Sequence, residues 1–156
     1  MKERMNKEKQ EFIEEMARTC EQAFGLPRMG GRVWGTLLLT EEDYLSSEDL
    51  MAQINASRGT VSTMVRLLER VGFIKRVSIP GDRRHYYTTS ASESLMHAEL
   101  ASLKMFISLM ERGKRALSAG DEKGRERLDG IRELMVFFEK EYAALMDRWH
   151  KQKAQQ

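Results

Sequence analysis

The sequence predicts a mainly α-helical protein with one small β-hairpin. Apolar residues recur at helical spacing over most of the 156-residue chain. β-branched and aromatic residues are frequent in 73–79 and 85–89, on either side of a Pro-Gly-Asp turn, which is typical of a hairpin. The length suits one compact domain, in which the hairpin belongs to a central region, 24–90.

Two short helices joined by a tight turn are predicted between Ser46 and Gly72. Ser46 and Asp49 have the spacing of a capping box at the start of the first helix. Ser57 is a good N-cap for the second helix, and Gly72 can adopt the left-handed conformation that ends it. With the hairpin that follows, the order of elements is that of a winged helix-turn-helix, so the fold class is mainly α with a small β-hairpin wing.

The second of these helices has an apolar face and a polar, cationic face. The residues expected to point inward are Val61, Met64, Val65, Leu68 and Val71. The outer face has small hydroxyl side chains, which let a helix approach DNA closely, and arginines, which can bind phosphates or a guanine edge. Because Glu69 is the only acid between Ser57 and Gly72, an ordinary solvent-exposed face of mixed charge is the weaker interpretation.

Positive charge is concentrated between Arg58 and Tyr87. This stretch has seven Lys or Arg and two Asp or Glu, a net charge of +5, whereas the whole chain has +2. Such clustering is expected of a surface that binds nucleic acid. The predicted DNA-binding residues are Ser57, Arg58, Thr60, Ser62, Thr63, Arg66, Arg70, Arg76, Arg83 and Arg84.

Two stretches carry a resemblance to a known family. They are RGTVSTMVRLLERVGFIKR and PGDRRHYY, which resemble the recognition helix and the wing of the MarR family of bacterial transcription regulators. The preceding GLPRMGGRVWGTLLL is similar to the opening of its GbsR-like branch. The resemblance covers roughly residues 24–89, with the Asp-Arg-Arg of the wing as its most specific feature. It implies that Arg84 enters the minor groove while Asp82 steadies it, and that the protein is a homodimer with interlocked terminal helices.

Helical regions are predicted on both sides of the central region, in 1–23 and 91–150, followed by a polar tail, 151–156. The C-terminal region has two heptad stripes, which pack either within one bundle or against a partner subunit. The dimer is favoured because a single winged helix makes only a small DNA footprint. The predicted dimerisation residues are Phe12, Met16, Leu103, Ile107, Met110, Phe138, Tyr142, Leu145 and Trp149.

Four further features of the sequence each have a functional and a structural interpretation. Gly30 and Gly31 are expected to allow close helix packing, since no phosphate-binding glycine motif is present. Cys20 could sense oxidants, but its place on an apolar stripe favours core packing. His85 is either a pH-sensitive phosphate contact or, the favoured interpretation, an ordinary surface histidine. The resemblance to the GbsR-like branch suggests an aromatic cage for a quaternary ammonium ion, built from Trp34, Tyr44, Phe106 and Trp149. Packing in the core or at an interface is the favoured interpretation of these four residues.

No catalytic, metal or nucleotide motif is found, so we expect no enzyme activity, no cofactor and no metal site. The charged start MKERMNKEKQEF lacks the apolar run of a secretory or membrane segment, which favours a cytoplasmic protein. The expected function is sequence-specific transcriptional regulation. The protein would bind a pseudo-palindromic operator in double-stranded DNA as a homodimer, most simply as a repressor that a small-molecule effector releases. The alternative is a winged-helix module that binds another protein through the same surface.

Overall fold

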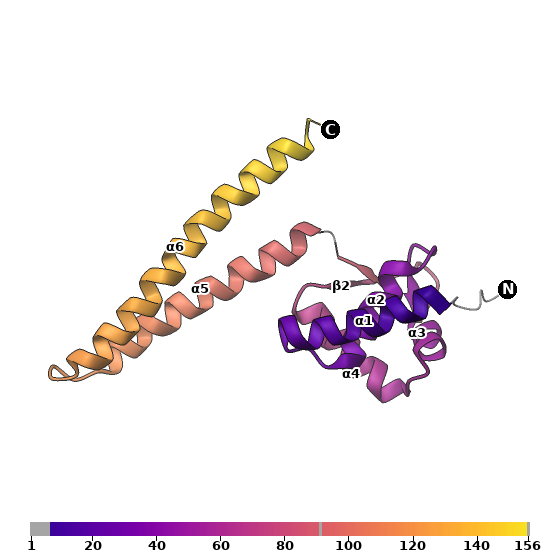
Figure 1. The fold of residues 1–156 in the computed structure, drawn as a ribbon, viewed down its shortest axis with the longest axis horizontal. Helices are drawn as coiled ribbons and strands as arrows, with labels where there is room; N and C mark the ends of the chain where they lie inside the picture. The colour runs from indigo at the N-terminus through magenta and orange to yellow at the C-terminus, as the bar shows by residue number, and fades with distance from the viewer. Residues whose placement is uncertain (1–6, 91, 156) are drawn as a thin grey trace. The chain divides into compact units, whose positions relative to one another are not determined.

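The computed structural model describes residues 7–90 and 92–155, with only the backbone for 92–95. The fold is mainly helical, with a small three-stranded antiparallel sheet (Figure 1). The chain forms two compact units, Met1–Ala91 and Ser92–Gln156, and each is described by itself. The ends of the predicted flanking regions and tail at residues 1–6, Ala91 and Gln156 lie outside the described residues.

In the first unit, α1 (Lys7–Phe24) packs along α2 (Arg28–Leu39). The approach is close because α2 has glycine where the helices meet: a Cβ atom on Gly31 would lie 2.6 Å from the Cα of Ala17. A Cβ on Gly30 would lie 3.6 Å from the sulfur of Met64 in α4. The prediction of close packing is therefore confirmed for Gly31, whereas a Cβ atom on Gly30 would make only an ordinary van der Waals contact.

The helix-turn-helix consists of α3 (Ser47–Ile54) and α4 (Arg58–Arg70). The capping box is confirmed, because the amide of Asp49 donates to Ser46 Oγ at 3.0 Å and the amide of Ser46 donates to Asp49 Oδ2 at 3.3 Å. Asn55 ends α3 in the left-handed region, with φ of 51°. After α4, Gly72 takes a φ of 80°, as the sequence predicts for the residue that ends this helix.

The sheet has one more strand than the sequence predicts. The expected hairpin is present as β2 (Ile74–Val77) and β3 (Tyr86–Thr89), with Arg76 opposite Tyr87. In addition, β1 (Leu45–Ser46) pairs antiparallel with the other edge of β3, which gives the order β1-β3-β2. A two-residue strand is too short to show an alternating pattern, so periodicity could not reveal β1.

The core of the first unit contains side chains from α1, α2, α3 and α4 and from the sheet. Its fully buried side chains include Val33, Val61, Leu50 and Leu68. Both helices of the helix-turn-helix thus bury their apolar faces in one cluster, and the inward orientation predicted for Val61 and Leu68 is confirmed. This burial holds the opposite face of α4 toward solvent.

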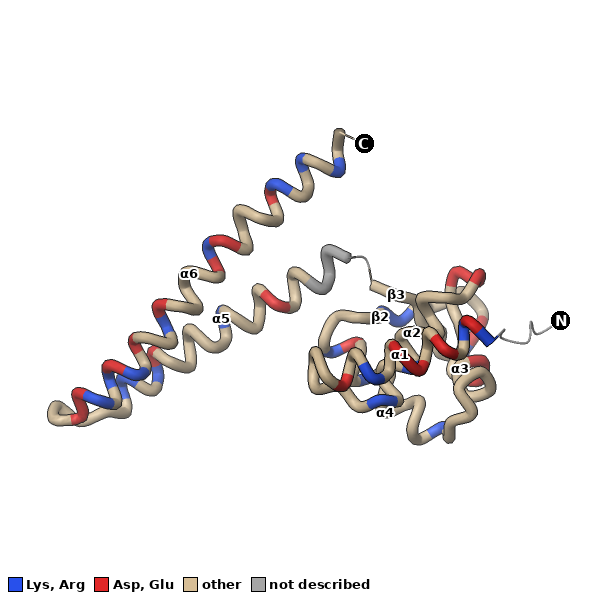
Figure 2. The backbone as a smooth tube through the Cα atoms, viewed as in Figure 1, with Lys and Arg blue, Asp and Glu red and all other residues tan. Residues whose placement is uncertain are grey.

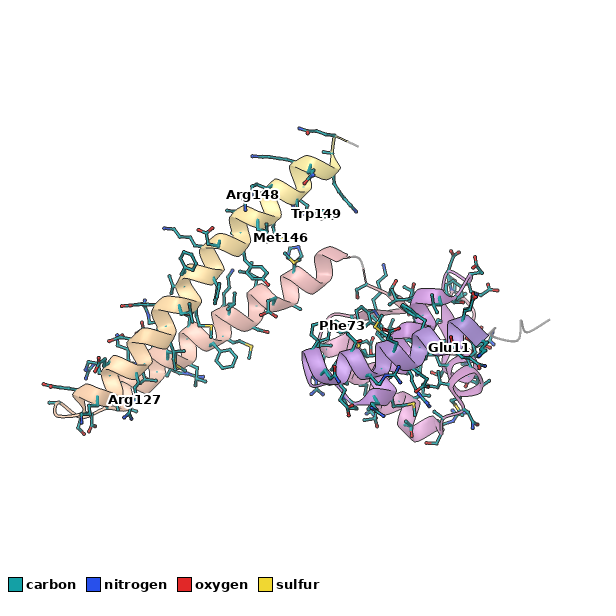
Figure 3. All side chains as sticks on the ribbon, viewed as in Figure 1. Glu11, Phe73, Arg127, Met146, Arg148 and Trp149 are labelled. Atoms are coloured by element: carbon teal, nitrogen blue, oxygen red, sulfur yellow. The ribbon has the colours of Figure 1, made fainter. Side chains whose placement is uncertain are left out.

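The second unit consists of α5 (Ser92–Ala116) and α6 (Glu122–Lys153), which pack against each other. α6 continues three residues into the predicted tail. Met146 is buried, whereas Trp149, near the same end of α6, is 40% exposed (Figure 3). No described helix combines the length and the apolar character needed to cross a membrane.

Candidate nucleic-acid interface

The outer face of α4 is polar and begins at a capped N-terminus. The amide of Thr60 donates to Ser57 Oγ at 3.1 Å, so Ser57 is the N-cap that the sequence predicts. Arg58, Thr63, Arg66 and Arg70 are exposed, while Thr60 and Ser62 are partly buried. The structure therefore brings the predicted DNA-binding residues of this helix to its solvent-exposed side. Figure 2 marks the basic positions along the backbone of α4.

Arg66 lies back along its own helix. Its Nε donates to the carbonyl oxygen of Ser62 at 3.0 Å, and its Nη2 donates to Ser62 Oγ at 3.1 Å. The neighbouring Thr63 donates its hydroxyl to the carbonyl of Gly59 at 2.9 Å. The polar side chains on this face are thus held by short-range hydrogen bonds one helical turn away.

Arg58 at the start of α4 pairs with an acid that the sequence analysis did not single out. Its Nη2 lies 3.6 Å from Oε1 of Glu48 in α3. Both side chains are largely exposed, so this ion pair contributes little to the free energy of folding. Glu48 does partly offset the positive charge that Arg58 brings to the first turn of α4.

The tip of the wing is organised around Asp82. Its Oδ2 accepts hydrogen bonds from Arg84 Nη2 at 2.6 Å and from the hydroxyl of Tyr86 at 2.8 Å. Its Oδ1 accepts from the backbone amide of Arg84 at 2.9 Å. The guanidinium of Arg84 also lies over the ring of Tyr86, 5.2 Å from its centroid. Gly81, with φ of 82°, supplies the left-handed residue of the turn.

These contacts shift the protonation equilibria of the wing. Hydrogen bonds from the side chain and backbone of Arg84 hold the pKa of Asp82 well below its ordinary value. The same side-chain hydrogen bond raises the pKa of Arg84. Burial raises the pKa of Tyr86, and the hydrogen bond that it donates to Asp82 acts in the same direction. The pair therefore stays ionised and the tyrosine stays neutral at physiological pH.

The remaining basic residues of the wing differ in their contacts. Arg76 on β2 contacts Nδ1 of His85 through its Nη2. Arg83 is exposed, and no ion pair or hydrogen bond joins its side chain to the described residues. The tip of the wing thus presents one restrained arginine, Arg84, and one unrestrained arginine, Arg83.

Aromatic contacts in the first unit are packing contacts. Trp34 lies against Phe73 with ring centroids 4.4 Å apart, and Tyr44 meets Tyr86 edge-on at 5.0 Å. Phe73 is labelled in Figure 3. Packing rather than a cage was predicted for Trp34 and Tyr44, and their contacts agree with it. Tyr44 in addition supports the ring against which Arg84 lies.

Cys20 is fully buried in the core of the first unit, as predicted for a packing residue. Burial raises the pKa of its thiol. Among the residues that the structure describes, no group of three or more His, Cys, Asp or Glu side chains could hold a metal ion.

The predicted dimerisation residues differ in exposure. Phe12 is 39% exposed, whereas Met16 packs against the core of the first unit. In the second unit Leu103 is buried and Ile107, Met110 and Tyr142 are partly buried. The exposed large apolar side chains of α5 and α6 are Met105, Phe106, Leu109, Ile131, Leu134, Phe137, Phe138, Leu145 and Trp149.

A helix-turn-helix with a basic outer helix and a basic β-hairpin beside it defines a winged-helix DNA-binding protein. Comparison with known families agrees with this class. The model of the MarR family matches residues 37–86, which span the helix-turn-helix and most of the wing. A second model, described as an MmpR5-like MarR family transcriptional regulator, matches residues 90–152 and thus the helices of the second unit.

Comparison with individual proteins supports the same class. The chain is 31% identical over 141 residues to the HTH-type transcriptional regulator MmpR5 of Mycobacterium tuberculosis, a match that covers 89% of this chain and 85% of that protein. A crystal structure described as that of a transcriptional regulator has 30% sequence identity and a TM-score of 0.83, and covers 92% of this chain and 99% of its own. This protein therefore belongs to the MarR family of DNA-binding transcriptional regulators, with likeness to MmpR5. It is accordingly a regulator rather than an enzyme. The finer resemblance to the GbsR-like branch stays a prediction.

Two contributors to this surface, Tyr86 and Glu48, were missed by sequence reasoning. Tyr86 and Tyr87 are both buried, so alternation along β3 does not single out the one that contacts Asp82. Glu48 lies in the first turn of α3, where an acid is expected for the helix dipole alone. Only the packing of α3 beside α4 brings its carboxylate to Arg58.

Proposed function

We propose that this MarR-family protein is a sequence-specific repressor that binds a pseudo-palindromic operator as a homodimer. In this proposal α4 enters the major groove and the wing approaches the minor groove or backbone. The observation that carries it is the outward placement of charge: the stretch from Arg58 to Tyr87 carries the net +5, and its arginines are exposed while the apolar side of α4 is buried. Such a surface releases counterions when it meets phosphates.

The two basic elements have different proposed roles. The hydroxyls near the N-terminus of α4, with Arg58 and Arg70, contact phosphates and fix the register on the duplex. Arg66 contacts a base edge, because it projects from the exposed side of α4. Arg84, held by Asp82, enters the narrow minor groove or neutralises a phosphate.

The proposed homodimer is supported by the second unit. Its exposed apolar side chains include Phe137 and Phe138 on α6 and Phe106 on α5, which one copy of the unit leaves in contact with solvent. A second copy of the chain would cover them. Two-fold symmetry would place two α4 helices in major grooves about one helical turn of DNA apart, which matches a pseudo-palindromic operator.

Repression, release by an effector and action in the cytoplasm are supported by the resemblance to MarR regulators. A dimer on a promoter would repress transcription by blocking access to it, and a small-molecule effector would release it. Its place of action would be the cytoplasm, where bacterial DNA lies. The competing proposal, a winged-helix surface that binds another protein, rests on the same exposed residues and is an outcome of the following test.

The test compares Arg66→Ala with Arg84→Ala on a duplex selected by the wild-type protein from a random pool, and on a scrambled duplex, at several salt concentrations. Arg66→Ala should cost about 1–3 kcal/mol on the selected duplex and relax the preference at one base pair in each half-site. Arg84→Ala should weaken binding to both duplexes and flatten the salt dependence by about one unit per subunit.

The matched control is Lys140→Ala, which removes one positive charge from an exposed position of α6 outside the proposed surface. It should leave affinity and salt dependence at wild-type values. If both arginine variants instead match the wild-type protein on both duplexes, these elements do not contact DNA, and binding of a protein partner becomes the better proposal.

A further inference from the structure

The contact between Arg66 and Ser62 restricts which edge of the guanidinium can meet DNA. An arginine has five N–H donors in a rigid plane: one on Nε and two on each terminal nitrogen. Ser62 accepts from Nε through its carbonyl oxygen at 3.0 Å and from Nη2 through its hydroxyl at 3.1 Å. These two N–H groups form one side of the guanidinium, so Ser62 occupies that side.

The other bidentate edge stays available. The outward N–H groups of Nη1 and Nη2 are parallel and form the adjacent edge of the guanidinium, which the two hydrogen bonds to Ser62 leave unused. Two parallel donors match the O6 and N7 acceptors of guanine in the major groove. Adenine offers an acceptor at N7 but a donor at N6, so one of the two N–H groups would lack a partner there.

The same contact lowers the entropic cost of recognition. Arg66 is exposed, and a free arginine at such a position would lose rotamer freedom when it binds a base. Because Ser62 already restrains the guanidinium, part of that loss is taken when the protein folds. The neighbouring Thr63 gives no such support to Arg66, since it donates its hydroxyl to Gly59 instead.

We infer that Ser62 is a positioning residue: its hydroxyl holds Arg66 so that the terminal edge of the guanidinium selects guanine in each half-site. This inference rests on the proposed binding of DNA by α4. It assigns Ser62 a role through Arg66 rather than a direct contact with DNA. The residues concerned are one helical turn apart on the exposed side of α4, so no other element is needed for the arrangement.

The contact can be tested without DNA. In nitrogen NMR spectra of the free protein, the hydroxyl of Ser62 should slow rotation of the Arg66 guanidinium about the Nε–Cζ bond, so that its two Nη signals are resolved. Ser62→Ala should average them, and Ser62→Thr, which keeps the hydroxyl, should restore them. Alanine is a better helix former than serine, so the first variant should not unfold α4. Averaged Nη signals in the wild-type protein would overturn the inference.

The consequence for DNA is tested by replacing each guanine of the selected duplex with 7-deazaguanine, which lacks the N7 acceptor. At the contacted guanine the wild-type protein should lose affinity by about 2- to 12-fold, roughly half of the 1–3 kcal/mol of a good bidentate contact, because O6 is kept. Ser62→Ala should reduce that loss severalfold and leave the salt dependence unchanged, because no charge is removed. Ser62→Thr should behave as the wild-type protein does.

The double variant decides whether Ser62 acts through Arg66. In an Arg66→Ala background, Ser62→Ala should have no further effect on the preference for guanine. A persistent effect would mean that Ser62 contacts DNA directly, and an unchanged preference in the single variant would mean that it has no role; either result overturns the inference and leaves the proposed function standing. If the wild-type protein selects no duplex, the proposed function itself fails, and the inference fails with it.

Discussion

The Asp82 carboxylate binds the Arg84 guanidinium, with Nη2 of the arginine 2.6 Å from Oδ2 of the acid. Tyr86 donates its hydroxyl to the same oxygen at 2.8 Å and supports the guanidinium with its ring. Tyr44, from the loop before β1, packs on that ring. The wing arginine is therefore anchored to the body of the first unit through a chain of contacts, rather than carried on a bare hairpin tip.

Loss of this anchor should reduce specificity more than overall affinity. Asp82→Asn removes a negative charge from the wing, which raises non-specific attraction to phosphates, and also weakens the restraint on Arg84. We expect the ratio of specific to non-specific affinity to fall by about two- to tenfold, the effect of losing one ordinary hydrogen bond of roughly 0.5–1.5 kcal/mol. Tyr86→Phe is the matched variant, because it keeps charge and ring but removes the hydroxyl. Tyr86→Phe should lower the ratio of specific to non-specific affinity less than Asp82→Asn does, and should leave the salt dependence unchanged. A larger fall in Tyr86→Phe than in Asp82→Asn would contradict the prediction.

The wing pair should also survive acidification. The folded-state pKa of Asp82 is lowered, so the stabilisation from its ionised form is present above the unfolded-state pKa, about 4, and is lost only as the pH falls through the lower folded value. We therefore expect no contribution from Asp82 to the pH dependence of DNA binding between pH 5 and 8. Carbon NMR of the Asp82 carboxyl group gives the direct measurement. A titration midpoint near 4 would show that the Arg84 contact does not hold in solution.

The sequence predicts the helix-turn-helix well because its signals are local. Ser46 with Asp49, Ser57 and Gly72 are caps whose geometry depends on a few neighbouring residues, and all of them occur as predicted. Contacts that depend on tertiary packing could not be predicted from local sequence signals. The pairing of β1 with β3, the ion pair of Glu48 with Arg58 and the hydrogen bond of Tyr86 to Asp82 all join residues whose partners no periodicity identifies.

Ala17 shows the same limit on the apolar side. It is small and does not stand out in an apolar stripe, yet it is buried at the closest approach of α1 to α2. The sequence did suggest close packing at Gly31, because glycine inside a helix costs stability relative to alanine. It could not indicate the residue on the other helix. The same holds for exposure on α5 and α6, since a heptad stripe does not say which side chains one hairpin buries and which it leaves to a partner.

Gly31→Ala should destabilise the first unit. The added Cβ would lie 2.6 Å from Ala17 Cα and 3.0 Å from the carbonyl oxygen of Met16, and these backbone atoms can move only if the helices separate. Overpacking of this kind costs about 1–3 kcal/mol. The control is Gly130→Ala in α6, where the added Cβ would have only the backbone of its own helix and its chain neighbours within 4 Å, and alanine should gain roughly 0.5–1 kcal/mol. Urea unfolding gives the free energy of unfolding of both variants and of the wild-type protein. A Gly31→Ala variant as stable as the wild-type protein would show that α1 and α2 are not so closely packed.

Cys20 should be a structural residue with little reactivity. Burial raises its pKa, so the thiolate that reacts with oxidants is scarce. Peroxide should therefore leave DNA binding unchanged in the wild-type protein and in Cys20→Ser. The serine variant should lose about 1–3 kcal/mol of stability if its hydroxyl lacks a partner in the core, and Cys20→Ala should separate this cost from that of lost volume. Rapid, stoichiometric oxidation of Cys20 with loss of DNA affinity would overturn the structural assignment.

The proposed homodimer should depend on the exposed apolar side of α6. Phe138 is 42% exposed, and a charge at this position would be buried without a partner if a second copy covers it. Phe138→Glu should therefore convert a dimer to monomers at micromolar concentration, as measured by sedimentation equilibrium, and weaken operator binding, since half-sites would then bind separately. Lys140→Glu changes the charge by more but lies on the opposite side of the helix, so it should leave the dimer intact. A wild-type protein that sediments only as a monomer, or a Phe138→Glu variant that remains dimeric, would mean that this face of α6 does not join two copies.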